Sequence, residues 1–148
     1  MYQRILVPVD GSDCGRRGLA EAIALARLAQ ARIRVVHVVD EPVLAIGTGV
    51  ALGASEDLAR SAREGGQQVL ADAAATVRRA GIPVDELLMD SFDGRLCELV
   101  AEAAEAWQAD LMVLGTHGRR GVDRLLLGSA AERIVRRSAV PVLLVRHP

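Results

Sequence analysis

The chain has 148 residues, 51% of them apolar and 25% charged, which is enough for one well-buried domain and typical of globular rather than disordered proteins. Its net charge of −1 argues against a nucleic-acid binder, because such domains usually carry a strong basic excess. All eighteen cationic residues are arginines, which excludes mechanisms that need a Schiff-base or phosphate-clamping lysine. We therefore treat residues 1–148 as a single domain.

Strand and helix signals alternate through the first half of the chain. Residues 4–9 form a short apolar run, predicted to be a strand, that ends at Asp10-Gly11-Ser12. Apolar residues then recur at helical spacing over 19–29, and a continuous β-branched run over 33–39 predicts a second strand. The stretch 40–55 holds one proline and three glycines, so we predict a long loop there.

The second half continues the alternation. Apolar spacing over 62–77 predicts a helix that ends near Gly81. Gly65-Gly66 lies inside it without a local reason, since each glycine costs about 1 kcal/mol relative to alanine in a helix interior. The remaining predicted elements are, in order, a strand over 84–89, a helix over 96–107, a strand over 111–114, a helix over 130–135 and a strand over 140–145.

This order of elements predicts an α/β fold, a doubly wound, open, five-stranded parallel sheet with helices on both faces. Ligands of such sheets bind beyond the carboxyl ends of the strands, where the strand order reverses. The first strand ends at Asp10 and the fourth at Gly115. If those two strands are neighbours, both following loops face one crevice, but the pattern of elements alone leaves their adjacency open.

The most informative motif follows the fourth strand. Gly115-Thr116-His117-Gly118 is followed by nine residues and then by Gly128-Ser129, at the start of a predicted helix. Glycines let the backbone approach a ligand, and a helix N-terminus offers unpaired N–H groups and partial positive charge, so together they favour phosphate binding. A loop followed by a capping box, formed by Ser129 and Glu132, explains the same residues without a ligand. The residues alone support both interpretations equally.

Other candidate residues also have two interpretations. The Asp10 carboxylate fits a ribose hydroxyl or a metal reached through water, and it fits an Asp-Gly turn that bonds its own backbone slightly better. His117 and Arg119 fit phosphate contacts, although a solvated loop face is the more ordinary role for a single arginine. His37 is predicted to be packed and hydrogen-bonded within the second strand. The histidines lack metal-ligand spacing, and no catalytic set is evident.

Four segments together resemble the universal stress protein family over nearly the whole chain. They are Val7-Pro8-Val9-Asp10-Gly11-Ser12, Val36-His37-Val38-Val39-Asp40, Gly115-Thr116-His117-Gly118 with Gly128-Ser129, and Pro141-Val142-Leu143-Leu144-Val145. The spacing Gly-x2-Gly-x9-Gly-Ser/Thr is the ATP-binding pattern of that family, and it is complete in this sequence. The resemblance implies strand order 3-2-1-4-5, which makes the first and fourth strands neighbours.

The resemblance also implies how an adenine nucleotide would lie. The motif glycines and the Ser129 hydroxyl would hold ribose and phosphates, and Asp10 would meet the ribose or a phosphate-bound Mg²⁺ or Mn²⁺. Pro8 and Val9 would line the base pocket, with Val38 and Leu114 on either side of the adenine. The implied cofactor-binding residues are Pro8, Val9, Asp10, Val38, Leu114, Gly115, His117, Gly118, Arg119, Gly128, Ser129 and Ala130.

For function, the resemblance implies an ATP-binding protein of the stress response, with AMP or ADP as other resident ligands. It would act as a nucleotide-dependent switch or as a homodimer that binds a protein partner. Family members dimerise through the last strand, and the apolar run over 140–145 needs a cover if it forms an edge strand. The alternatives are a nucleotide-free dimeric interaction protein and an ATP-hydrolysing enzyme, which should be slow because no general base is apparent.

The expected location follows from targeting signals and cysteine use. The first residues lead directly into a strand, without a basic segment followed by an apolar one, so no signal peptide is predicted. No apolar run approaches the roughly 18 residues that suggest a membrane span. Cys14 and Cys97 are isolated in the sequence, which suits a reducing compartment. We therefore expect a cytoplasmic protein.

Overall fold

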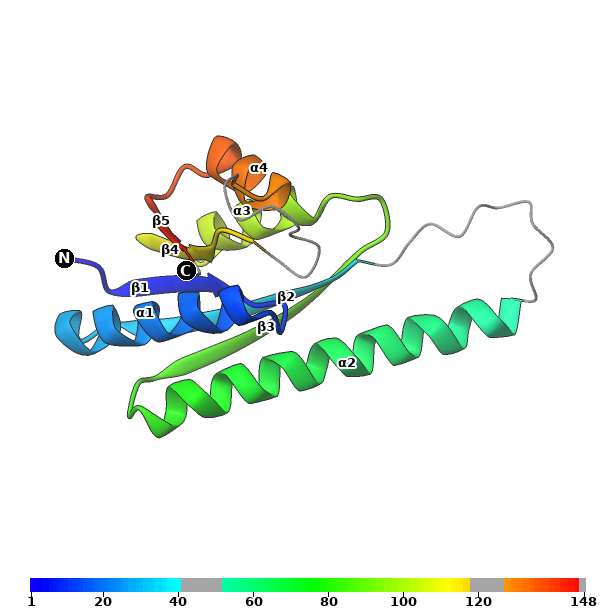
Figure 1. Cartoon of the computed structure of the whole chain (residues 1–148), viewed down its shortest axis with the longest axis horizontal. Coiled ribbons are helices and arrows are strands. Elements are labelled where there is room, and N and C mark those ends of the chain that lie inside the picture. Colours follow the sequence, from blue (N-terminus) through cyan, green and yellow to red (C-terminus); the bar gives the residue numbers. More distant parts are fainter. Residues whose placement is uncertain (41–51, 118–126, 147–148) are drawn as a thin grey trace.

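The computed structural model describes residues 1–40, 52–117 and 127–146 (Figure 1). Five parallel strands form one sheet in the order β3-β2-β1-β4-β5, which confirms the predicted fold and strand order. The elements are, in chain order, β1 (Arg4–Pro8), α1 (Asp13–Ala29), β2 (Arg32–Asp40), α2 (Leu52–Arg79), β3 (Val84–Ser91), α3 (Leu96–Ala106), β4 (Leu111–Gly115), α4 (Ser129–Arg137) and β5 (Val142–Val145).

Helices cover both faces of the sheet. On one face α1 and α2 pack over alternate strand residues such as Ile5, Val7 and Val35. On the other face α3 and α4 pack over the residues between them, such as Leu6 and Val36. Full burial of a Val, Leu or Ile side chain contributes about 1.5–3 kcal/mol, so these two apolar layers hold the sheet between two pairs of helices.

The strand order reverses between β1 and β4. The strand β1 pairs with β2 along its whole length, and it pairs with β4 through Ile5 and Leu6, which lie opposite Leu111 and Met112. The carboxyl ends of β1 and β4 therefore lie side by side at one edge of the sheet. Doubly wound sheets bind their ligands at this position, so the adjacency that the pattern of elements left open is settled.

Helix α2 begins earlier than predicted. Its first residue is Leu52, and β2 extends through Asp40, so the predicted loop is wrong for 40 and for 52–55, while 41–51 lie outside the described residues. Gly53 and Ser55 suggested a loop. The first turn of a helix leaves its N–H groups unpaired in any case, however, and it tolerates such residues. Within the described ranges, no helix is long and apolar enough to cross a bilayer.

The contact between α2 and β2 explains one of the two unexplained glycines. A Cβ on Gly66 would lie 2.7 Å from Cδ2 of His37 and 3.0 Å from Val39, so only glycine lets α2 lie this close to β2. The His37 ring is held by a hydrogen bond between Nδ1 and the Val9 carbonyl oxygen, 2.7 Å away, which confirms the prediction for His37. Nothing lies within 4 Å of a Cβ on Gly65, so that glycine has no comparable reason.

Candidate functional site

The turn after β1 builds the start of α1. The Asp10 Oδ1 accepts hydrogen bonds from the Ser12 backbone N–H at 2.9 Å and from the Ser12 hydroxyl at 2.5 Å. The Ser12 Oγ in turn accepts from the Gly15 N–H at 3.0 Å, which makes Ser12 the N-cap of the helix. The Asp-Gly turn that the sequence offered as the local interpretation of Asp10 is therefore formed, and it places this carboxylate at the N-terminus of α1.

The first turn of α1 lies directly against the end of β4. A Cβ on Gly115 would come within 2.7 Å of the Cys14 carbonyl oxygen, and a Cβ on Gly18 would come within 3.2 Å of the Gly115 nitrogen. The Cys14 Sγ lies 3.8 Å from Thr116 Oγ1 and donates to the Val145 carbonyl at 3.5 Å. Packing alone therefore requires glycine at position 115, with or without a ligand, because the backbone of α1 occupies the space that a side chain would need.

Helix α4 begins at the same strand end. The Gly128 N–H donates to the Thr116 carbonyl oxygen at 2.8 Å, and a Cβ on Gly128 would lie 2.8 Å from that oxygen. Gly128 is the N-cap, so Ser129 is the first helical residue and Glu132 bonds Arg136. The predicted capping box is therefore wrong, because a capping serine must stand one position earlier, before the helical residues.

The N-termini of α1 and α4 both contact Thr116, a residue that is 4% exposed. Each helix N-terminus carries unpaired N–H groups and roughly half a positive charge. No side chain caps the start of α4, and the Ser129 side chain is exposed there. At α1 the Ser12 cap and the Asp10 carboxylate already meet part of this potential, so the uncapped start of α4 is the more favourable position for an anion at the end of β4.

His117 provides a further polar group at this edge. Its Nδ1 lies 3.0 Å from the Thr116 hydroxyl, while its Nε2 is buried and has no hydrogen-bond partner in the structure as described. A buried polar atom without a partner costs about 1–3 kcal/mol. His117 therefore leaves one polar atom without a partner beside the start of α4 in the described structure.

The remaining implied nucleotide residues are distributed over both faces of the sheet. Val38 and Leu114 are 8% and 3% exposed and lie in the apolar layer beneath α3 and α4, whereas Val9 belongs to the layer beneath α1 and α2. Pro8, at the end of β1, is half-buried, and Ala130, in the first turn of α4, is exposed.

Gly118 and Arg119, which the sequence also predicts as nucleotide contacts, lie outside the described residues. The described part of the chain holds no group of three or more His, Cys, Asp or Glu side chains that could bind a metal ion.

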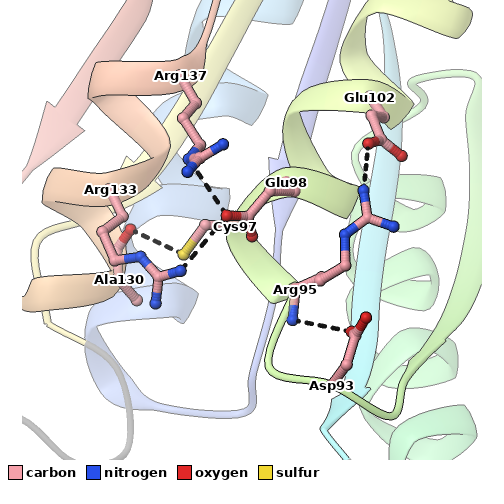
Figure 2. Close-up of polar contacts among 8 residues, drawn as sticks. All are labelled: Asp93, Arg95, Cys97, Glu98, Glu102, Ala130, Arg133 and Arg137. Carbon is pink, nitrogen blue, oxygen red and sulfur yellow. Dashed lines mark hydrogen bonds and ion pairs between the residues drawn. The ribbon is translucent and has the colours of Figure 1, made fainter.

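A polar cluster that the sequence did not suggest joins α3 to α4 (Figure 2). The Glu98 Oε1 lies 3.2 Å from Arg137 Nε and 3.4 Å from Arg133 Nη2, and the Cys97 Sγ donates to the Ala130 carbonyl at 3.6 Å. The only sequence signal for this cluster is the four-residue spacing of Arg133 and Arg137, which places both on one side of a helix.

Charges and burial shift the pKa values of both residues of α3 in this cluster. A hydrogen bond from its own backbone N–H and the charges of Arg137 and Arg133 lower the pKa of Glu98, against the opposing effect of burial. Burial raises the pKa of the Cys97 thiol, and the charge of Arg133 opposes that rise. Glu98 is therefore an anion and Cys97 a neutral thiol near neutral pH, as their hydrogen bonds require.

Comparison with known proteins relates the whole chain to one family. The family model described as universal stress protein family matches residues 1–146. A universal stress protein of Thermus aquaticus is 35% identical over 146 residues, which cover 99% of this chain and 100% of the relative.

Two solved structures show the same arrangement of elements. A universal stress protein family member from Burkholderia pseudomallei is 33% identical, with a TM-score of 0.80 over 99% of this chain and 97% of that one. The universal stress protein of Archaeoglobus fulgidus, solved in complex with dAMP, is 25% identical, with a TM-score of 0.67 over 98% of each chain.

Proposed function

The chain belongs to the universal stress protein family, and from that membership we propose that it binds an adenine nucleotide at the carboxyl ends of β1 and β4. The observation that carries the proposal is the meeting of the α1 and α4 N-termini at Thr116, since the uncapped start of α4 offers N–H groups to phosphate and the α1 dipole adds positive potential beside it. The solved complex of the Archaeoglobus fulgidus relative with dAMP supports the same class of ligand.

Within this proposal the phosphates lie against Gly128 and Ser129, where α4 has no side-chain cap. His117 Nε2 supplies the polar atom that needs a partner. Asp10 contacts the ribose or a Mg²⁺ or Mn²⁺ ion that enters on the phosphates. The complete Gly-x2-Gly-x9-Gly-Ser spacing of the sequence favours ATP, with AMP and ADP as the other candidates.

The first experiment identifies what the protein carries and what it prefers. Mass spectrometry of the denatured, freshly purified protein should detect an adenine nucleotide, and calorimetry should give tighter binding of ATP, ADP or AMP than of GTP. Absence of binding to all four nucleotides would refute the proposal.

Two variants locate the site. Ser129→Ala removes one hydroxyl near the phosphates and should weaken ATP binding about tenfold, the value of one hydrogen bond to a charged group. Asp10→Asn keeps the Oδ1 acceptor of the turn and removes the charge, so it should weaken MgATP more than AMP. Unchanged affinity in both variants would place the nucleotide elsewhere.

We further propose that the protein acts as a nucleotide-dependent switch or partner-binding homodimer that pairs through β5. In support, β5 is an edge strand whose Leu143 and Leu144 are 38% and 37% exposed, and an uncovered apolar edge is a liability. Light scattering with and without ATP should show a dimer that Leu143→Glu disrupts. A dimer that binds no nucleotide would favour the nucleotide-free interaction protein, and ATP turnover well above one per minute that Asp10→Asn abolishes would favour an enzyme.

A further inference from the structure

Helix α4 buries little apolar surface against the rest of the protein. It has nine residues, and only Ala131 and Ile134 are buried. Its N-terminus bonds the end of β4 through Gly128. These two side chains set which face of α4 points to the core, but they bury little apolar surface, so small rotations of the helix about its axis cost little.

Glu98 of α3 supplies the missing constraint. Its side chain is 16% exposed, and one of its oxygens, Oε1, lies within 3.5 Å of both Arg133 and Arg137. These arginines are four residues apart, so they lie on one stripe of α4, one turn above the other, and Figure 2 shows both reaching toward Glu98. Because one carboxylate binds side chains from two successive turns, it fixes the rotation of α4 about its own axis.

Ser129 lies on the same stripe. It precedes Arg133 by four residues and is the first residue of α4, so a rotation that moves Arg133 also moves the Ser129 hydroxyl. The next residue, Ala130, accepts the hydrogen bond of Cys97 through its carbonyl oxygen. Cys97 therefore holds the first turn of α4 through a backbone carbonyl, and the next residue of α3, Glu98, holds the later turns through the side chains of two arginines.

We propose that Glu98 is a positioning residue for the phosphate end of the nucleotide site, because its ion pairs with Arg133 and Arg137 set where α4 presents the Ser129 hydroxyl. This inference rests on the proposed function. Glu98 itself makes no contact with the ligand and acts through α4.

The direction in which ATP affinity changes distinguishes a positioning role of Glu98 from a purely electrostatic one. Removal of a negative charge near an anion site, with two arginines released beside it, would strengthen ATP binding by electrostatics alone. Loss of positioning weakens it, because the hydroxyl is no longer held where the phosphate needs it. Glu98→Gln therefore separates the two effects by the direction of the change.

The test measures the Kd of ATP and of adenosine for the wild type, Glu98→Gln and Glu102→Gln. The last is a matched control, since Glu102 lies on α3 one turn further and pairs with Arg95 rather than with α4. We expect Glu98→Gln to raise the Kd of ATP about fivefold, the scale of a partly exposed ion pair, and to leave the Kd of adenosine unchanged. Glu102→Gln should change neither value.

Two further variants test whether a weaker ATP affinity in Glu98→Gln comes from the ion pairs rather than from general misfolding. Arg137→Met removes the ion-pair partner of Glu98 that lies further along α4 from Ser129, through a side chain that is 56% exposed, and it should weaken ATP binding in the same direction as Glu98→Gln. In a Ser129→Ala background, Glu98→Gln should lose its effect on the Kd of ATP, because the hydroxyl it positions is gone.

Equal weakening of ATP and adenosine, tighter ATP binding, or an undiminished Glu98→Gln effect without Ser129 would each overturn the positioning role while nucleotide binding stands. A wild type that binds neither ATP nor adenosine would instead end the proposed function, and this is seen before any variant is compared.

Discussion

The helices α1 and α4 begin at the same strand end but are held there by different means. Helix α1 has 17 residues, seven of them buried, and a side-chain cap, and its first turn presses against the backbone of β4. Helix α4 has nine residues, two of them buried, no side-chain cap, and ion pairs to α3. The first N-terminus is fixed by close packing and the second by polar side chains.

This contrast assigns different roles to the two halves of the proposed site. Packed interiors resist displacement because any shift costs dispersion contacts and opens voids. Partly exposed ion pairs are individually weak and easily exchanged. The α1 side therefore forms a rigid wall, and α4 is the half whose orientation a ligand or a neighbouring side chain can adjust.

The largest expected effect comes from one methyl group added at each junction. A Cβ at Gly115 would lie 2.7 Å from the Cys14 carbonyl oxygen, and a Cβ at Gly128 would lie 2.8 Å from the Thr116 carbonyl oxygen. Gly115→Ala should lower the free energy of unfolding by about 2–3 kcal/mol, because α1 cannot move away, and Gly128→Ala by about 1 kcal/mol, because α4 can move at the cost of weakening the Gly128–Thr116 hydrogen bond. Urea denaturation measures both, and equal losses would contradict the contrast.

A smaller effect separates the two serines. Ser12→Ala should cost about 1 kcal/mol of stability, because the Ser12 hydroxyl caps α1 through Gly15. Ser129→Ala should leave the free energy of unfolding nearly unchanged, because Ser129 caps nothing, while its effect on ATP binding remains. A stability loss in Ser129→Ala as large as in Ser12→Ala would show that the described start of α4 is wrong.

The smallest effect is a pH dependence of the ion pairs between Glu98 of α3 and the arginines of α4. The pKa of Glu98 is lowered in the folded protein from its ordinary value of 4.5, first by its backbone hydrogen bond and then by Arg137 and Arg133. A carboxyl whose folded pKa is lowered contributes stability above 4.5 that is lost as the pH falls through its folded pKa. The wild type should exceed Glu98→Gln in stability near neutral pH and converge with it in acid. A constant difference in urea unfolding from neutral to acid pH would contradict this linkage.

Element type and order could be read from the sequence because they depend on local apolar spacing. In the described part of the chain the strands and helices follow the predicted alternation, and the strand order follows the family resemblance. Errors arose where local preference and tertiary structure differ. The glycine at 53 suggested a loop, yet α2 already begins at Leu52, and the spacing of Ser129 and Glu132 suggested a capping box one residue out of register.

The reasons for the glycines could not be read locally. Gly66 is required by His37, which is 29 positions earlier in the sequence, and Gly115 by Cys14 across the sheet edge. The pairing of Glu98 with α4 also joins residues 35 or more positions apart. Such contacts depend on how closely two elements approach, which the fold sets and which no window of neighbouring residues contains. The roles of the implied nucleotide residues and the single-domain assignment stay predictions.

The two free cysteines place one thiol in each of the compared junctions. Cys14, in the first turn of α1, is 5% exposed and its sulfur contacts the end of β5, whereas Cys97, in the first turn of α3, is 2% exposed and its sulfur contacts α4. A maleimide reacts with either sulfur only when its helix lifts away, so the two alkylation rates, separated by peptide mass mapping, report the local opening of each junction. The protein thus carries its own pair of kinetic probes without an introduced label, and a bound nucleotide should slow the reaction at Cys97 more than at Cys14.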